Sequence, residues 1–203
     1  MAQRQRIRPT QQRAVRMRRD LLDATVQLLE EVGSERLTTS AIVERAHVSS
    51  GTFYRYFDDK AGILEVLRQE AVTEIAADLM AGVARALDHD LREAVREVVA
   101  TLTDAFERHA PVILAMVDAV PSGTQSNVMP EIEAGLVNLA RVIPMRHLPG
   151  VSPERLEALV FVTMGVTQAS CLRIALQRPT GSSREELIDI ATDMLTAGLR
   201  GTA

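Results

Sequence analysis

Apolar residues recur with helical spacing along most of the chain, and the clearest case lies between Leu37 and Leu64. Two apolar pairs in this stretch are each separated by four positions, Ile42 with Ala46 and Phe53 with Phe57. Each pair therefore falls on one face of a short helix. The pattern predicts two short helices that pack on each other, followed by a third helix that begins after Asp58-Asp59.

Residues with side-chain oxygens stand where these short helices should begin. Thr38 or Thr39 can cap the first helix and Ser49 the second, because each oxygen can accept a hydrogen bond from a free backbone N–H in the first turn. Residues 46–48 then remain for the connection. Three residues are the length that the turn of a helix-turn-helix needs, so we predict this motif.

The second short helix should present an outer face without acidic residues. Its hydroxyl groups and its one guanidinium suit base edges and phosphate oxygens, and Gly51 would let a backbone approach closely. An ordinary helical hairpin with a solvated polar face is the alternative. The predicted DNA-contacting residues in this motif are Thr38, Thr39, Ser40, Ser49, Ser50, Gly51, Thr52, Tyr54, Arg55 and Tyr56.

Helical periodicity, caps and proline or glycine breaks predict an all-α protein of about nine helices. Besides the two short helices, the expected helices span residues 13–32, 60–87, 91–109, 111–120, 130–147 and 153–177, with a last helix capped by Ser183 and ending near residue 199. Residues 121–127 and 148–150 are expected to be loops. The predicted organisation is a basic flexible arm at 1–12, a DNA-binding domain at 13–59, and a larger domain at 60–203.

The charge is distributed unevenly along the chain. Residues 1–60 carry 11 basic and 8 acidic residues, whereas residues 61–203 carry 12 basic and 19 acidic residues. A basic N-terminal part joined to an acidic body is typical of a DNA-binding segment attached to a soluble partner domain.

Several features indicate a cytoplasmic protein. Cys171 is the single cysteine, so no intramolecular disulfide can form and a reducing compartment is suitable. We find no apolar run that approaches the roughly 20 residues of a membrane span, and no apolar segment follows the N-terminal arginines as it would in a secretory signal. We therefore expect no membrane partner.

The helix-turn-helix region resembles the DNA-binding domain of the TetR family of transcriptional regulators. The matching positions are Ala46, Val48-Ser49, Gly51-Thr52, Tyr54, Tyr56-Phe57, Lys60 and Leu64, preceded by Leu21-Leu22, Ala24 and Leu28-Leu29. The resemblance covers about the first third of the chain, and the rest is similar only in its helical layout. The family usually has glycine where this chain has His47. That position tends to need a left-handed backbone, which histidine tolerates better than most non-glycine residues.

The resemblance implies a repressor that leaves a palindromic operator when a small, largely apolar effector binds the C-terminal domain. It also implies that Lys60 contacts the operator backbone and that the last two helices form a homodimer. Small residues among apolar ones on these helices would allow close approach, although such a stripe also suits an internal core. The predicted interface residues are Gly165, Ala169, Leu172, Leu187, Ile190 and Met194.

Candidate effector contacts combine adaptable apolar side chains with polar residues inside apolar runs. They are Phe106, Met116, Asp118, Asn138, Met164 and Gln168. Each methionine could instead fill a gap in the core, and each polar residue could bond a neighbouring backbone carbonyl. The sequence leaves both interpretations open.

Two alternative classes of function make different demands on the sequence. A DNA-binding regulator of the same fold without a small-molecule effector would be controlled by a protein partner or act architecturally, and it would have a solid core where a ligand-responsive regulator has a cavity. An enzyme is disfavoured, because the histidines lack metal-ligand spacing, no glycine-rich phosphate loop is present, and Cys171 has no histidine nearby in sequence. We therefore predict no enzymatic activity, no cofactor and no metal.

Overall fold

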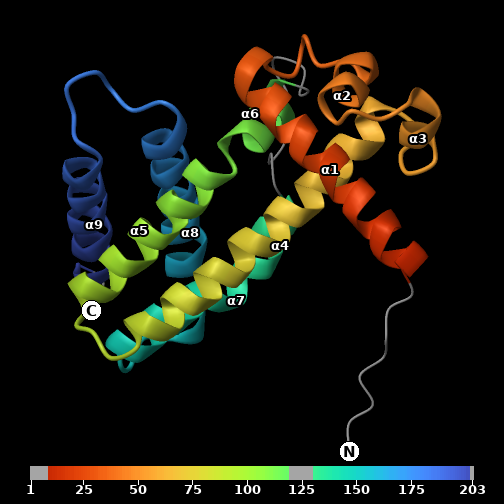
Figure 1. The fold of residues 1–203 in the computed structure, drawn as a ribbon. Helices are drawn as coiled ribbons and strands as arrows, with labels where there is room; N and C mark the ends of the chain where they lie inside the picture. Colours follow the sequence, from red (N-terminus) through yellow and green to blue (C-terminus); the bar gives the residue numbers. More distant parts are fainter. Residues whose placement is uncertain (1–8, 119–129, 202–203) are drawn as a thin grey trace, which may run out of the picture. The chain divides into compact units, whose positions relative to one another are not determined.

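The computed structural model describes the backbone of residues 9–118 and 130–201, and the side chains of residues 12–116 and 137–201. Every regular element within these ranges is an α-helix, which confirms the predicted all-α class (Figure 1). The helices are α1 (Pro9–Val32), α2 (Thr39–Arg45), α3 (Ser50–Tyr54), α4 (Lys60–Ala86), α5 (Leu91–Arg108), α6 (Ala110–Asp118), α7 (Pro130–His147), α8 (Pro153–Leu176) and α9 (Arg184–Arg200). Arm residues 1–8, the predicted loop at 121–127 and the side chain of Asp118 lie outside the described residues.

Two helix boundaries differ from the expected ones by three residues or more. Helix α1 begins at Pro9 instead of residue 13, because proline fits the first turn of a helix, where its missing N–H would have no partner anyway. Helix α3 ends at Tyr54, so Phe57 lies beyond the helix although it remains buried. Gly51 and the β-branched Thr52 are weak helix formers, which is consistent with so short an element.

Side-chain caps begin the helices at the predicted positions. The Thr38 hydroxyl oxygen accepts a hydrogen bond from the backbone N–H of Ala41 at 3.1 Å, and Ser49 accepts one from Thr52 at 3.2 Å. Capping oxygens also start the later helices, with bonds from Gly62 to Asp59 at 2.8 Å, from Arg155 to Ser152 at 3.3 Å and from Glu186 to Ser183 at 3.1 Å. Each bond satisfies an N–H group that has no partner within its own helix.

The chain forms two compact units, one of residues 1–70 with 111–124 and one of residues 71–110 with 125–203. The predicted domain boundary between residues 59 and 60 falls where α4 begins, whereas the division between the two units falls within α4, between residues 70 and 71. In the first unit α2 packs against both α1 and α3. The core of this unit consists of fully buried side chains that include Leu21, Leu22, Leu37, Ile42, Phe53 and Ile63.

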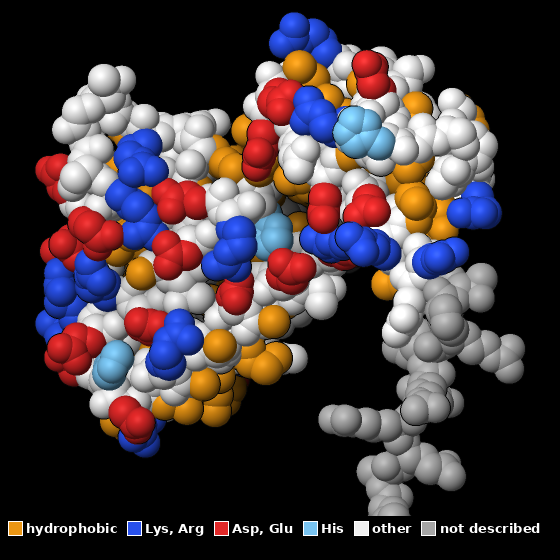
Figure 2. All heavy atoms as spheres, in the orientation of Figure 1, with side chains coloured by type: hydrophobic (Ala, Val, Ile, Leu, Met, Phe, Trp, Pro, Cys, Tyr) orange, Lys and Arg blue, Asp and Glu red, His pale blue; other side chains and the backbone are white. Residues whose placement is uncertain are grey.

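In the second unit α5 packs on α8 and α9, and α7 packs on α8. Ion pairs join α5 to the α9 region along the exposed side of this packing, where basic and acidic side chains alternate in Figure 2. Because most of these side chains remain in contact with solvent, each pair contributes about 1 kcal/mol or less. The pairs are Arg92–Asp193, Arg96–Asp189, Arg96–Glu185, Arg184–Asp104 and Arg184–Glu107.

Helix α8 is more apolar than the sequence analysis indicated. An 18-residue window within Pro153–Leu176 has a mean hydropathy of 1.6, so the helix is long and apolar enough to cross a membrane by length and composition alone. Only 22% of that window is buried inside the chain. The expectation was that no apolar run approaches the roughly 20 residues of a membrane span. Scattered polar residues do interrupt the run in α8, but they leave its mean hydropathy high.

Cys171 is fully buried on the apolar helix α8, and its thiol donates to the carbonyl oxygen of Val99 at 3.5 Å. Burial raises the pKa of this thiol to about 12.

At pH 8 we expect native Cys171 to react with a disulfide reagent roughly a thousandfold more slowly than in urea-unfolded protein, because only the thiolate is nucleophilic. The unfolded thiol ionises near pH 9, so the Cys171 contribution should lower stability as pH rises above 9. Equal labelling rates in the two states would contradict this burial.

Candidate functional site

The turn between α2 and α3 has the strained backbone that the sequence predicted. His47 has a φ of 54°, and it alone among the described non-glycine residues has a positive φ. Backbone hydrogen bonds close the turn on both sides of His47, from Ala46 to Ile42 at 2.9 Å and from Val48 to Val43 at 3.0 Å. The turn therefore keeps its geometry despite the cost of a side chain in the left-handed region.

Replacing His47 with glycine should raise the free energy of unfolding by about 1 kcal/mol, since glycine adopts a positive φ without a clash with Cβ. Chemical denaturation measures the change. Glu44→Gly is the matched control, because Glu44 is an exposed residue within α2 and the same replacement there should lower stability by about 1 kcal/mol. A loss of stability in both variants would show that the His47 side chain makes a favourable contact.

Helix α3 presents the predicted polar face. Ser49, Ser50, Gly51, Tyr54 and Arg55 are exposed, with the Tyr54 side chain 58% accessible. Thr52 and Tyr56 are half-buried. A Cβ added at Gly51 would meet only the Ser49 hydroxyl oxygen, at 3.9 Å, so packing within the chain does not require glycine there. This open space suits the approach of another molecule's backbone.

Two features hold the polar groups of this face in defined positions. The Arg55 guanidinium donates to the Tyr56 hydroxyl at 3.1 Å and lies 5.0 Å from the centre of its ring. The hydroxyls of Ser49 and Thr52 share a hydrogen bond at 3.0 Å. An arginine held against an aromatic ring loses less conformational entropy when it binds a phosphate.

The neighbouring helix α2 is oriented by a pair that sequence spacing did not reveal. Arg45 donates two hydrogen bonds to the Glu31 carboxylate, at 2.8 Å and 2.6 Å, which joins α2 to the end of α1. The hydrogen bond from Arg45 lowers the pKa of Glu31. At the start of α2, Thr38 and Ser40 are exposed and Thr39 is half-buried. These threonines and Ser40 thus remain predicted DNA contacts, whereas the Arg45 guanidinium is already paired.

The Lys60 ammonium donates to the backbone carbonyl of Ser34 at 3.3 Å, and its side chain is half-buried. This bond links the first turn of α4 to the segment that follows α1. An ammonium group has three donors, so Lys60 retains donors for a phosphate oxygen while it holds Ser34.

Lys60→Gln should lower affinity for every duplex and reduce the slope of log affinity against log salt by about one. Glutamine can still donate to the Ser34 carbonyl, so the variant removes the charge and keeps the hydrogen bond. DNA titrations at several salt concentrations measure the slope, with Lys60→Arg as the variant that keeps the charge. A loss limited to one DNA sequence would indicate base recognition by Lys60 instead.

The second unit carries an exposed apolar face on α8 and α9, which pack against each other. Of the predicted interface residues, Gly165, Ala169, Ile190 and Met194 are exposed, whereas Leu172 and Leu187 are half-buried. Three further large apolar residues of this face are exposed and are not among the predicted interface residues. These are Phe161 at 76%, Val162 at 58% and Val166 at 41% accessible. Phe161 and Val162 lie four and three positions before Gly165, and Val166 lies four positions after Val162. Helical spacing alone could therefore have placed them on this face.

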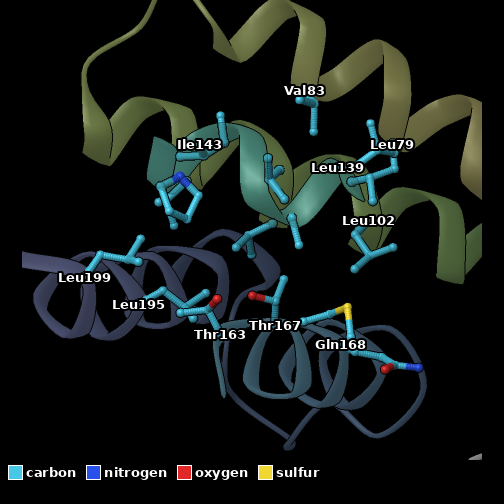
Figure 3. Close-up of a pocket in the computed structure, with 16 residues that line it drawn as sticks. Leu79, Val83, Leu102, Leu139, Ile143, Thr163, Thr167, Gln168, Leu195 and Leu199 are labelled. Carbon is cyan, nitrogen blue, oxygen red and sulfur yellow. The ribbon is translucent and has the colours of Figure 1, made fainter. Parts of the chain in front are cut away.

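A cavity of about 90 Å³ lies within the second unit, among α4, α5, α7, α8 and α9 (Figure 3). Its lining is mainly aliphatic. The lining residues are Leu79, Val83, Val95, Val98, Val99, Leu102, Leu139, Ala140, Ile143, Pro144, Thr163, Met164, Thr167, Gln168, Leu195 and Leu199. The predicted effector contacts Met164 and Gln168 are among them.

The other predicted effector contacts lie elsewhere. Phe106 is fully buried and Asn138 is exposed, and neither lines the cavity. Met116 belongs to the first unit. Thr163 and Thr167 were not singled out in the sequence, although their four-residue spacing from each other predicts a shared helix face.

Two protein families match this chain, one in the helix-turn-helix region and one in the C-terminal region. Residues 21–67 match the model of bacterial regulatory proteins of the tetR family, and residues 90–199 match a tetracyclin repressor-like C-terminal domain. The HTH-type transcriptional regulator BetI of Burkholderia thailandensis is 34% identical over 99 residues, which are 47% of this chain and 49% of BetI. The chain thus spans about half the length of the curated relatives that it matches.

Solved structures share the fold at low sequence identity. A tetR-family transcriptional regulator from Streptomyces coelicolor has a TM-score of 0.69 at 20% sequence identity. The match covers 92% of this chain and 81% of the Streptomyces chain. The fatty acid degradation regulator FadR from Bacillus halodurans has a TM-score of 0.66 at 18% sequence identity. The match covers 97% of this chain and 99% of the FadR chain. With both of its domains matched, the chain belongs to the TetR family of bacterial regulatory proteins.

Proposed function

We propose that this protein is a cytoplasmic, homodimeric repressor that leaves a pseudo-palindromic operator when a small, largely apolar effector binds its C-terminal unit. The observation that carries the effector part is the cavity itself. A regulator controlled only by a protein partner needs no internal space, whereas this unit has about 90 Å³ among aliphatic side chains. The alternative of a regulator without an effector is therefore not favoured.

The polar face of α3 reads the DNA and the N-terminal residues of α2 and α4 contact the backbone. One helix-turn-helix contacts few base pairs, so a single copy binds weakly. Two copies related by a two-fold axis read half-sites about one helical turn, or a multiple of it, apart. The exposed apolar face of α8 and α9 supports this dimer, because a soluble protein rarely leaves so many large apolar side chains in water without a partner.

Helix α4 connects the two activities. It begins at Lys60, which we assign to the operator backbone, and its later residues Leu79 and Val83 line the cavity. An effector that binds the conformation unable to bind DNA more tightly than the DNA-bound one shifts the population away from the operator. An effector with equal affinity for both conformations would release nothing.

A titration of the pure protein against DNA from upstream of its own gene tests this function, since such regulators often act on their own promoters. A scrambled duplex of the same length and composition, at the same salt concentration, is the control. Footprinting should give a two-fold symmetric protected region, and affinity for the scrambled duplex should be weaker by at least about a thousandfold. Equal binding to both duplexes would contradict a specific operator in that fragment.

A further inference from the structure

The cavity in the second unit excludes charged ligands. None of the described residues that line it is an acid, a lysine, an arginine or a histidine. A carboxylate or an ammonium would lose its hydration there without gaining a partner of opposite charge, and such a loss is far larger than an apolar contact can repay. The ligand that fits is therefore uncharged at neutral pH.

The polar groups of the lining gather on α8. Figure 3 shows the hydroxyls of Thr163 and Thr167 pointing toward the cavity, with the leucines of α9 beside them and the leucines and valines of α4, α5 and α7 opposite. The amide of Gln168 lies at the edge of the group. Apart from this amide and the two hydroxyls, the lining side chains are aliphatic or, for Met164, a thioether.

The two hydroxyls have different hydrogen-bonding capacity. Thr163 donates its hydrogen to the carbonyl oxygen of Leu159 at 2.6 Å, so its oxygen is left only as an acceptor. Thr167 has no hydrogen-bond partner among the residues that the structure describes and can both donate and accept. A ligand group that uses Thr163 as an acceptor and the hydrogen of Thr167 as a donor must itself both donate and accept. A hydroxyl does both, whereas an ether or a ketone can only accept.

The volume indicates the size of ligand that the lining can surround. A space of about 90 Å³ corresponds to roughly six to nine water molecules, since each needs about 10–15 Å³. A ligand of roughly six to nine non-hydrogen atoms fills it. The aliphatic walls, which contain no aromatic ring among the described residues, suit a flexible saturated chain.

We propose that the cavity binds an uncharged aliphatic alcohol of roughly six to nine non-hydrogen atoms, whose hydroxyl donates to Thr163 and accepts from Thr167. This proposal names the chemical class of the effector and so rests on the proposed function. The binding claim itself concerns the free protein and is tested without DNA.

Calorimetric titration of the whole protein with a series of linear alcohols tests the class directly. Affinity should rise roughly fourfold with each added methylene and stop rising once the ligand exceeds about nine non-hydrogen atoms. 1-Hexanol should bind roughly fivefold more tightly than methyl pentyl ether, which has the same number of atoms and no donor. Hexanoate and hexylammonium should show no binding even at a roughly hundredfold higher concentration than hexanol. Burying their unpaired charge costs more free energy than the apolar contacts return. Hexanoate binding equal to that of hexanol would overturn the proposal.

The position of the ligand is tested by NMR of protein with labelled methionine methyl groups. Hexanol should shift the signal of Met164, which lines the cavity, and leave the exposed Met80 and Met194 unshifted. The variant Thr167→Val should weaken hexanol binding roughly fivefold and abolish the preference for hexanol over the ether. Thr192→Val is the control for loss of a threonine hydroxyl elsewhere in the same unit, since Thr192 is buried in α9, donates to the Ile188 carbonyl and does not line the cavity. An unshifted Met164, or the same loss in both variants, would overturn the assigned site.

A separate mobility assay on operator DNA distinguishes the two proposals. Hexanol that binds with a Met164 shift but does not release DNA would contradict the effector function and leave the ligand class intact. Specific DNA binding by a protein that takes up none of the alcohols would contradict the ligand class and leave the DNA-binding function intact.

Discussion

Replacing Phe161 with glutamate is expected to convert the protein from a dimer to a monomer and to lower its affinity for the operator on the order of a hundredfold. Phe161 is 76% exposed in the single chain, and Val162, Val166 and Met194 of the same apolar face are exposed too. A carboxylate on this face would be buried without a partner when two copies meet, which costs several kcal/mol. The single chain itself loses little, because the Phe161 ring is largely in water there.

Sedimentation measures the loss of the dimer, and circular dichroism shows that the helices remain. The matched control is Ala77→Glu, since Ala77 is an exposed residue of α4 in the same unit but on another helix. It should leave both the dimer and operator affinity unchanged. A Phe161→Glu variant that sediments as a tight dimer would place the interface elsewhere.

Replacing Gly82 with alanine is expected to lower the free energy of unfolding by about 1–3 kcal/mol. A Cβ at this position would lie 2.7 Å from the Thr101 hydroxyl oxygen and 2.9 Å from its methyl group. Thr101 cannot rotate freely, because its hydroxyl accepts from Arg85 at 3.2 Å and donates to Glu97 at 3.4 Å. The sign is informative, since glycine to alanine inside a helix normally raises stability by about 1 kcal/mol.

Chemical denaturation of a double-mutant cycle tests the cause. Thr101→Ala should remove the overlap, so the double variant should be more stable than the sum of the two single changes predicts. Gly62→Ala is the control in the same helix, because the Cβ there meets nothing closer than an Asp59 carboxylate oxygen at 3.7 Å. Additive effects at residues 82 and 101 would show that the two helices separate to accept the methyl group.

The local structure of the DNA-binding region was predictable because its interactions span few residues. The caps by Thr38 and Ser49 act over three positions, and both were expected from the type of residue and its place before an apolar pair. The left-handed turn at His47 likewise followed from the length of the connection and the motif. The start of α1 and the end of α3 were misplaced, since helix propensity does not fix where the first and last turns lie.

The effector contacts were predicted less well, because a cavity is lined by residues from distant parts of the chain. Met164 and Gln168 were identified as candidates on α8, but the leucines and valines that complete the lining come from α4, α5, α7 and α9. Their spacing looks the same as that of ordinary core residues. Phe106 met the sequence criteria and is instead fully buried outside the cavity.

By itself the sequence determined the helical class, the helix starts and the helix-turn-helix, because each depends on interactions between neighbours in the chain. The tertiary structure decided which apolar residues form a core, which line a cavity and which stay in water. Thr101 opposes Gly82, Arg45 pairs with Glu31, and Phe161 is left exposed only because of how separate helices pack. The spacing of apolar residues indicates that a helix has an apolar face. Only the packing of the helices determines which residues, or solvent, that face contacts.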